Sequence, residues 1–304
     1  MTVLSQGLIT GVGPARVVRP ERQGARDCWR SYAHRRLTGV FEGAAEVPFD
    51  HSSRFIFLSD CHRGNGSRAD AFARNQDLFL HVLGQYYDQG YTYIEVGDGD
   101  ELWKSWRFED ILRAHGPVFD LLHRFDREAR LHLIAGNHDQ RNGRRGAVDK
   151  DGLVAREGLT LRHDQTGQRL FVVHGHQADL KSDRLSRVSR LAVGHIWRRL
   201  QLIGLVEATS QMGHIWKLKR MERAIMSWAE ARRQIIICGH THRPMAAVHG
   251  EAPYFNAGSC VFLGCITGLE LINDEISLVS WHLRGGVRLE RQVVAPPCKL
   301  HSLA

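Results

Sequence analysis

The feature that most constrains the fold is a series of short apolar runs, each of which ends in polar residues. Residues 54–60 (RFIFLSD), 91–98 (YTYIEVGD) and 130–137 (RLHLIAGN) have the length and composition of buried strands. The stretches around 72–83 and 117–125, which lie between them, have the apolar spacing of helices. This alternating order predicts right-handed crossovers and a largely parallel sheet, so the fold class is α/β.

The pattern changes after residue 142. Residues 159–164 and 168–175 predict paired strands around a DQTG turn, and residues 234–240 predict another strand. Short strands follow at 253–258, 265–272, 275–283 and 287–294. We therefore expect an α/β half followed by a more antiparallel half, with a helical insertion at about 178–233.

The first 50 residues differ from the rest of the chain because arginine dominates them between residues 15 and 37. We predict a basic N-terminal extension over residues 1–50, followed by one domain over residues 51–304. A solvated tail and a docking segment are both compatible with this composition. The net charge of +8 over 304 residues favours an anionic partner, such as a phosphorylated substrate, a lipid headgroup or nucleic acid.

Five polar segments stand at the carboxyl ends of predicted strands, where α/β proteins collect ligands and catalytic groups. They are Asp60-Cys61-His62, Gly97-Asp98 with Glu101, Gly136-Asn137-His138-Asp139, His174-Gly175-His176 and Gly239-His240-Thr241-His242. An extended backbone would put the side chains of Asp60 and His62 on one side of the chain, and the same holds for His240 and His242. We therefore expect all five segments to meet at one rim.

Carboxylate, amide and imidazole groups in this combination suit divalent first-row metals. Asp98 can bridge two ions, and ions about 3.5–4 Å apart activate a bridging hydroxide and bind the phosphoryl oxygens. The chain has no obvious serine or cysteine nucleophile motif, which agrees with this hypothesis. His138 is placed to bind the phosphate or protonate the leaving oxygen, and Asp139 to orient His138 or stabilise its turn.

The series DCH, GDGDE, GNHD, HGH and GHTH resembles the calcineurin-like metallophosphoesterase superfamily over about residues 54–283. The resemblance implies a four-layer α/β/β/α sandwich with a helical insertion and two metals. It implies that the metal ligands are Asp60, His62, Asp98, Asn137, His174, His240 and His242. Asp98 would be shared, and His138 would be the catalytic histidine. We expect Mn²⁺ before Fe, Zn, Co, Ni or Mg. We also expect substrate contacts from Arg63, Asn65, Arg141 and His176.

A closer resemblance is to the UDP-2,3-diacylglucosamine pyrophosphatase-like branch. Its cues are GDxxELW around residues 98–103, a helical insertion before GHTH, and the run YFNAGSC with CITGLEL. The resemblance implies cleavage of a pyrophosphate in a nucleotide-linked glycolipid. The chain departs from this branch in carrying His138 in place of arginine and His176 in place of aspartate.

The predicted insertion is basic and amphipathic. Between residues 181 and 233, Lys and Arg outnumber Asp and Glu by twelve to four and alternate with apolar residues that include Trp197, Trp216 and Trp228. This pattern is typical of contact with an anionic membrane. A helical cap with its basic face in solvent is the alternative, and nucleic acid is less favoured because no nucleic-acid-binding module accompanies the pattern.

The remaining features point to the cytoplasm. The chain has no apolar run of the roughly 20 residues that a membrane span needs, and its N-terminus lacks the pattern of a secretory signal. Its six cysteines fit no metal-binding spacing and favour reduced thiols. We therefore expect a cytoplasmic protein, and the sequence leaves open whether its basic insertion contacts the inner face of the membrane or only solvent.

The main functional hypothesis is hydrolysis of a phosphoanhydride or phosphodiester, with a phosphorylated small molecule or glycolipid as substrate. One alternative is a phosphodiesterase or nuclease whose basic insertion grips a nucleic-acid strand. The other is a scaffold without catalytic activity, which loss of ligands would mark. All the predicted ligands and His138 are present in this chain.

Overall fold

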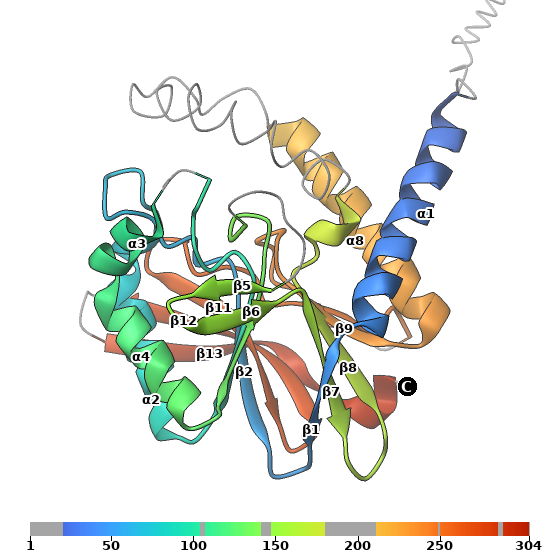
Figure 1. Cartoon of the computed structure of the whole chain (residues 1–304). Coiled ribbons are helices and arrows are strands. Elements are labelled where there is room, and N and C mark those ends of the chain that lie inside the picture. The colour runs from blue at the N-terminus through green and yellow to red at the C-terminus, as the bar shows by residue number, and fades with distance from the viewer. Residues whose placement is uncertain are drawn as a thin grey trace, which may run out of the picture.

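The structure is a computed structural model that describes residues 21–103, 107–140, 147–179, 211–248, 250–284 and 288–303. Two β-sheets lie face to face at its centre, and helices cover the outer face of each sheet (Figure 1). This arrangement confirms the α/β/β/α sandwich that the sequence resemblance implied.

The larger sheet has eight strands with a parallel centre. Their spatial order is β13 (Arg288–Lys299), β12 (Glu275–Arg284), β11 (Cys265–Ile272), β2 (Arg54–Leu58), β3 (Thr92–Val96), β4 (Leu131–Ile134), β6 (Leu153–Arg156) and β5 (Val148–Lys150). Strands β2, β3 and β4 are parallel, as the alternating sequence pattern predicts. Strands β11, β12 and β13 pair antiparallel, as expected for the C-terminal part. The hairpin β5–β6 is an addition that the sequence analysis missed.

The smaller sheet has five strands. Their order is β1 (Ala45–Phe49), β7 (Gly158–His163), β8 (Arg169–Val173), β9 (Ile235–Cys238) and β10 (Tyr254–Asn256). Strands β7 and β8 form the predicted antiparallel pair. In contrast to the expected antiparallel half, β8, β9 and β10 are parallel to one another, and β1 is parallel to β7. Because β1 precedes residue 51, this sheet begins inside the predicted N-terminal extension.

Two groups of helices form the outer layers (Figure 1). The larger sheet is covered by α2 (Gln76–Asp88), α3 (Phe108–Ala114) and α4 (Gly116–Arg127), and the smaller sheet by α1 (Glu21–Glu42) and α8 (Gln211–Arg232). Short 3₁₀ helices are η1 (Phe72–Arg74), η2 (His176–Ala178) and η4 (Leu300–Leu303). Most of the predicted helical insertion, residues 180–210, lies outside the described residues. None of the helices in the described part combines the length and apolarity that a bilayer span requires.

The buried strands are apolar on both faces because each sheet lies between two layers. In β2, Phe55 and Phe57 pack into the core between the sheets, while Ile56 and Leu58 pack against the helices. Successive side chains of a strand point to opposite faces, so a strand covered on both sides reads as a continuous apolar run. Strand β9 follows the same rule with the sequence IIIC.

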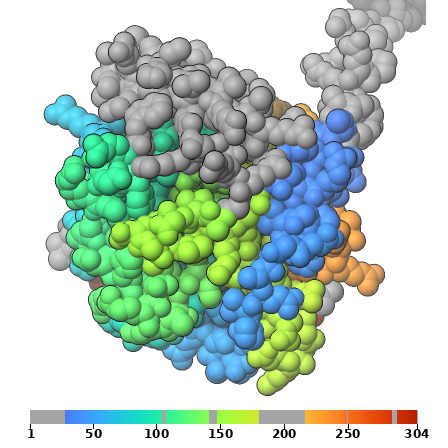
Figure 2. All heavy atoms as spheres, in the orientation of Figure 1, coloured from blue at the N-terminus to red at the C-terminus, as the bar shows by residue number. Residues whose placement is uncertain are grey.

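Helix α1 is docked on the smaller sheet, which is one of the two states that its sequence left open. Ala33 and Leu37 are fully buried in the cluster that also contains Trp228 of α8. The indole Nε1 of Trp228 donates a hydrogen bond to Thr38 Oγ1 at 3.0 Å. In the space-filling view α1 and the segment that follows it cover one flank of the molecule (Figure 2).

Candidate metal centre and active site

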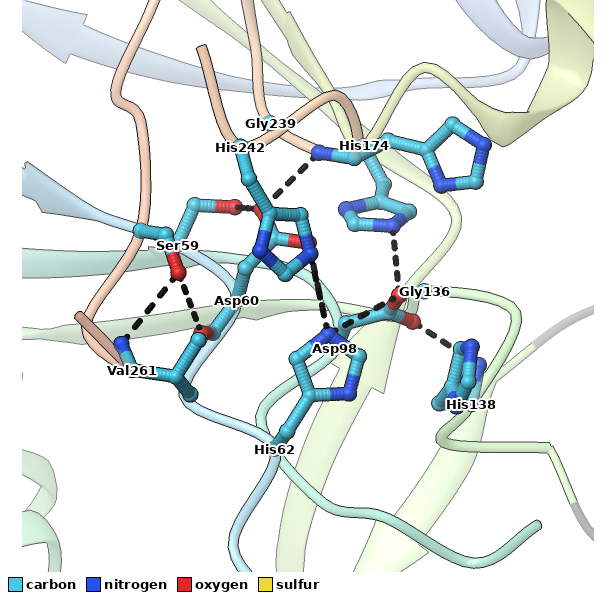
Figure 3. Close-up of polar contacts among 12 residues, drawn as sticks. Ser59, Asp60, His62, Asp98, Gly136, His138, His174, Gly239, His242 and Val261 are labelled. Carbon is cyan, nitrogen blue, oxygen red and sulfur yellow. Dashed lines mark hydrogen bonds and ion pairs between the residues drawn. The ribbon is translucent and has the colours of Figure 1, made fainter. Parts of the chain in front are cut away.

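The predicted ligands meet at one end of the two sheets. The segments that carry them follow β2, β3 and β4 of the larger sheet and β8 and β9 of the smaller sheet. Figure 3 shows the rings of His62, His174 and His242 gathered around the carboxylates of Asp60 and Asp98. The expected convergence therefore occurs, although two sheets rather than one supply the rim.

The backbone conformation of these segments differs from the extended one that we expected. Ten non-glycine residues in the described part have positive φ, and five of them are predicted ligands: Asp60 (55°), His62 (50°), Asp98 (50°), His240 (66°) and His242 (54°). Such conformations carry a cost and persist where the surroundings enforce them, typically at functional sites. The side chains therefore converge because the chain turns sharply after each strand, and the argument from extended backbone was wrong.

Two glycines allow the loops to approach closely. A Cβ atom on Gly97 would lie 2.4 Å from His174 Nδ1, and one on Gly136 would lie 2.1 Å from Asp98 Oδ1. Both distances are too short for any side chain. The glycines that precede Asp98 and Asn137 are thus required by the packing of one ligand segment against another.

One group of possible ligands consists of Asp60, His62 and His242. Asp60 Oδ1 lies 3.1 Å from His242 Nε2 and 3.7 Å from His62 Nε2, and the two imidazole nitrogens are 3.2 Å apart. The other carboxylate oxygen of Asp60 accepts hydrogen bonds from Ser59 Oγ at 2.5 Å and His240 N at 2.8 Å. One oxygen is therefore held by the protein, and the other faces the histidines.

A second group consists of Asp98, His174 and His240. Asp98 Oδ2 lies 3.1 Å from His174 Nε2 and 3.8 Å from His62 Nε2. Asp98 Oδ1 accepts a hydrogen bond from the His138 backbone N–H at 2.8 Å. Asp98 Oδ2 thus lies between a histidine of the first group and a histidine of the second, which is the position that a shared ligand requires.

The donor set fits divalent metal ions. His174 Nδ1 donates to the carbonyl of Val96 at 2.7 Å, so Nε2 of the neutral ring is an acceptor that faces a carboxylate oxygen. Two facing acceptors need a proton or a cation between them. A histidine whose other ring nitrogen donates a hydrogen bond to a backbone carbonyl, as Nδ1 does here, is typical of metal ligands. Asp60 Oδ1 and Asn137 Oδ1 are also buried acceptors that have no hydrogen-bond partner among the described residues.

The charges at the centre favour a cation. Burial raises the pKa of Asp98, but His174 and His138 outweigh it, and the pKa lies well below its ordinary value. Burial likewise lowers the pKa of His174, but Asp98 and Asp60 outweigh it and raise the pKa to about 9. The buried carboxylates therefore stabilise positive charge where the imidazole nitrogens face them.

His138 lies beside this centre with its ring fixed on two sides. Nδ1 donates a hydrogen bond to Glu101 Oε1 at 2.8 Å, and the ring stacks on Trp103 with centroids 4.2 Å apart. Burial raises the pKa of Glu101, but His138 outweighs it and holds that pKa well below its ordinary value. Glu101 is a residue of the site to which the sequence analysis assigned no role, although it lies three residues after Asp98 in a motif that we had singled out.

Asp139 and Arg63 lie next to the site without lining it. Asp139 Oδ2 accepts a hydrogen bond from Gly136 N at 2.7 Å, so it stabilises the turn and leaves the His138 ring to Glu101. Arg63 is fully buried and ion-paired with Glu95 and Asp100, at 2.7 and 2.8 Å. This placement corrects the expectation that Arg63 contacts substrate.

The other expected substrate contacts lie elsewhere or outside the described residues. Asn65 is exposed, and its Oδ1 accepts a hydrogen bond from Ser67 N in its own loop, away from the cavity. His176 is buried, with its ring centroid 5.5 Å from that of His174 and 6.3 Å from that of His240. Arg141 falls outside the described residues, so its role stays a prediction.

A cavity of about 540 Å³ opens over the centre. The predicted ligands Asp98, Asn137 and His240 line its floor together with His138. Its walls are more apolar and contain Ala71, Trp103, Leu218 and Val261, with Lys217 as a cation and Thr241 as a hydroxyl. The cavity therefore offers polar groups to a phosphate and apolar walls to the group attached to it.

Comparison with known proteins agrees with this geometry. A profile of the calcineurin-like phosphoesterase superfamily domain matches residues 108–264, which is more than half of the chain. The chain belongs to this superfamily. The match includes Asn137, His138, His174 and both histidines of GHTH, while Asp60, His62 and Asp98 precede it and join the site through the fold.

The solved structures that resemble this one are distant. Vacuolar protein sorting 29 from Cryptosporidium parvum has 11% identity and a TM-score of 0.42, with 82% of this chain and 100% of that chain covered. The cold-active protein-tyrosine phosphatase of a psychrophilic Shewanella has 14% identity and a TM-score of 0.39, with 82% of each chain covered. A putative 5′-nucleotidase from Staphylococcus aureus has 15% identity and a TM-score of 0.33, with coverage of 79% and 52%. No curated protein matches the sequence.

Proposed function

We propose that the protein is a dinuclear-metal-dependent phosphoesterase that hydrolyses a phosphodiester or phosphoanhydride. The observation that carries the proposal is the position of Asp98 between two groups of ligands. Asp60, His62 and His242 would hold one ion, Asn137, His174 and His240 the other, and Asp98 both. Bound divalent ions supply an activated water and positive charge for the phosphoryl oxygens. Mn²⁺ is our first choice among the several first-row metals that this donor set accepts.

His138 is the group that we assign to the leaving oxygen. Because Glu101 accepts the Nδ1 proton, Nε2 is the ring nitrogen that remains for the substrate. A protonated Nε2 would donate to a phosphoryl oxygen or to the departing oxygen, which is general acid catalysis. Trp103 limits rotation of the ring by stacking on it and so holds this nitrogen in one orientation.

For the substrate, we propose a nucleotide-linked glycolipid of the UDP-2,3-diacylglucosamine type. The cavity has an apolar wall, and two of its lining residues adjoin large exposed apolar side chains. Lys217 follows Trp216, which is 65% exposed, and Val261 precedes Phe262 and Leu263, which are 52% and 72% exposed. Exposed apolar side chains that adjoin lining residues of a polar site support a substrate with an acyl portion.

We also propose that α8 contacts an anionic membrane at the cytoplasmic face. Trp216, Lys219 and Arg223 are exposed and spaced three and four residues apart, so they form one stripe on the helix. A tryptophan with basic residues on one helix face is typical of interfacial helices. The same surface would bring the cavity to a substrate that is embedded in the membrane.

A substrate panel with Mn²⁺ tests the proposed function. It contains p-nitrophenyl phosphate, bis(p-nitrophenyl) phosphate, UDP-glucose, UDP-2,3-diacylglucosamine and single-stranded DNA. We expect EDTA-sensitive hydrolysis of the diester and fastest turnover of the glycolipid. Cleavage of DNA without hydrolysis of the glycolipid would show that the substrate is nucleic acid and not the glycolipid. Absence of all hydrolysis by protein that has bound Mn²⁺ would contradict the proposed activity.

A further inference from the structure

Five charged side chains form a buried network next to the proposed metal centre. Arg63, Glu95, Asp100 and Asp139 are fully buried, and Lys150 is 2% exposed. Two cations thus face three carboxylates, and none of the five side chains lines the cavity. A buried ion network is costly to form and often gives no more stability than apolar packing of the same volume. Its presence therefore calls for a role besides stability.

Asp139 joins two segments of the active site through their backbones. Its Oδ2 accepts a hydrogen bond from Gly136 N at 2.7 Å, and its Oδ1 accepts one from Asp100 N at 2.8 Å. The first segment carries His138, and the second carries Asp98 and Glu101. The Asp139 carboxylate consequently fixes the distance between the two segments.

Lys150 anchors that carboxylate from a separate element. Its Nζ lies 2.7 Å from Asp139 Oδ1 and 2.9 Å from Asp100 Oδ2. Lys150 belongs to β5, in the hairpin β5–β6, whose outer side lies on the molecular surface (Figure 2). Arg63 is directed to Glu95 and to the other oxygen of Asp100. Among the described residues, Lys150 is thus the cation that contacts Asp139.

We propose that Lys150 is a positioning residue of the hydrolytic centre. By binding Asp139 and Asp100 together, it sets the spacing of the segments after β3 and β4. It thereby holds the His138 ring against Glu101 and the His138 backbone N–H against Asp98 Oδ1. This inference rests on the proposed hydrolytic function. It adds Lys150, a residue that would contact neither the metal ions nor the substrate.

The test replaces Lys150 by a side chain of similar length without charge, Lys150→Met. The matched control is Glu95→Gln, which perturbs the same network, because Glu95 has only side chains as hydrogen-bond and ion-pair partners among the described residues, whereas Asp139 accepts hydrogen bonds from the backbone of both segments. Both proteins are compared with the wild type by circular dichroism, Mn²⁺ titration calorimetry and kinetics with bis(p-nitrophenyl) phosphate.

For Lys150→Met we expect kcat to fall about 10- to 100-fold and Mn²⁺ to bind about tenfold more weakly, as when groups that orient metal ligands are removed. The KM should stay within about twofold, because the residue does not contact substrate. Glu95→Gln should retain most of the activity and the Mn²⁺ affinity. Equal losses in both variants, or an unchanged kcat and Mn²⁺ affinity in folded Lys150→Met, would overturn the proposal.

If Lys150→Met does not fold, Asp139→Asn takes its place, since Lys150 acts through Asp139. The proposal then expects the same loss of kcat and Mn²⁺ affinity in a folded protein, and wild-type values would overturn it. The wild type separates the two ideas. A wild type that binds Mn²⁺ and hydrolyses the diester, together with an unaffected Lys150→Met, refutes only the positioning role. A wild type that does neither refutes the proposed function.

Discussion

Glu101 accepts a hydrogen bond from His138 Nδ1 at 2.8 Å, and the second oxygen of Glu101 lies 3.3 Å from His62 Nδ1. One carboxylate thus orients the proposed acid and a proposed metal ligand. Replacing a residue that orients metal ligands in this way usually lowers activity or metal affinity 10- to 100-fold. For Glu101→Gln we predict a fall of that order in kcat for bis(p-nitrophenyl) phosphate, with a small change in KM. An unchanged kcat would show that the pair has no role in catalysis.

Among the described residues that line the cavity, Lys217 is the cation, and Asp179, which is buried, pairs with it at 2.5 Å. We predict that Lys217→Met raises the KM for a diphosphate substrate, UDP-glucose or the glycolipid, about tenfold, the effect of losing about 1.4 kcal/mol of charge-assisted binding. The KM for bis(p-nitrophenyl) phosphate, which has a single phosphate, should change little. Equal effects on both substrates in steady-state kinetics would argue against recognition of a second phosphate.

The basic stripe on α8 gives a prediction for membranes. Each basic residue near an anionic surface contributes about 1 kcal/mol, so Lys219→Gln with Arg223→Gln should weaken vesicle binding roughly 30-fold. The measurement is co-sedimentation with phosphatidylglycerol vesicles, with phosphatidylcholine vesicles for comparison. The control is Lys299→Gln, at an exposed position on β13. If the wild type does not bind phosphatidylglycerol vesicles, the membrane contact is excluded.

Asp70, which lies outside the metal centre, gives a prediction for the pH dependence of stability. Burial raises the pKa of Asp70, but hydrogen bonds from His115 and from the backbone of Gly66 and Ala73 outweigh it, and the pKa is lowered. A lowered carboxyl pKa gives stability that is present above the unfolded pKa of 3.8 and is lost as the pH falls through the folded value.

We therefore predict that Asp70→Asn lowers the free energy of unfolding by about 1.5–3 kcal/mol at pH 7, as expected for hydrogen bonds to a charged group. The difference from the wild type should shrink as the pH falls below 4, where the wild-type carboxylate takes up its proton. Urea unfolding of the metal-free proteins at several pH values measures both quantities. A difference that stays constant down to pH 2 would contradict this account.

The sequence predicted the ligand segments better than it predicted their geometry. Asp60, Asp98, Asn137 and the GHTH histidines could be found because each follows a buried strand that reads as an apolar run. The left-handed turns that aim the side chains could not be found. They depend on contacts between segments, such as the hydrogen bond from His62 N to Asp98 O. The superfamily resemblance supplied the four layers, because the apolar runs alone do not say how two sheets pack.

The charged residues show the same limit. Arg63 was predicted to contact the substrate, whereas its burial depends on Glu95 and Asp100 in the next strand and loop. Lys150 was missed together with its hairpin. The sequence did hold a signal for the hairpin, because the pair Asp151-Gly152 is typical of tight hairpin turns. The structure agrees, since both residues have positive φ. The charge network that the hairpin completes joins separate segments and leaves no local pattern.

The most direct measurement determines Mn²⁺ stoichiometry and turnover in the same preparations of the wild type, Asp98→Ala and His138→Ala. If Asp98 is shared by two ions, the wild type binds two, and Asp98→Ala loses metal and turnover together. His138→Ala should keep both ions and hydrolyse bis(p-nitrophenyl) phosphate about 10²- to 10⁴-fold more slowly, the usual contribution of a general acid. An Asp98→Ala protein that lacks metal and still hydrolyses the diester at the wild-type rate would contradict the account.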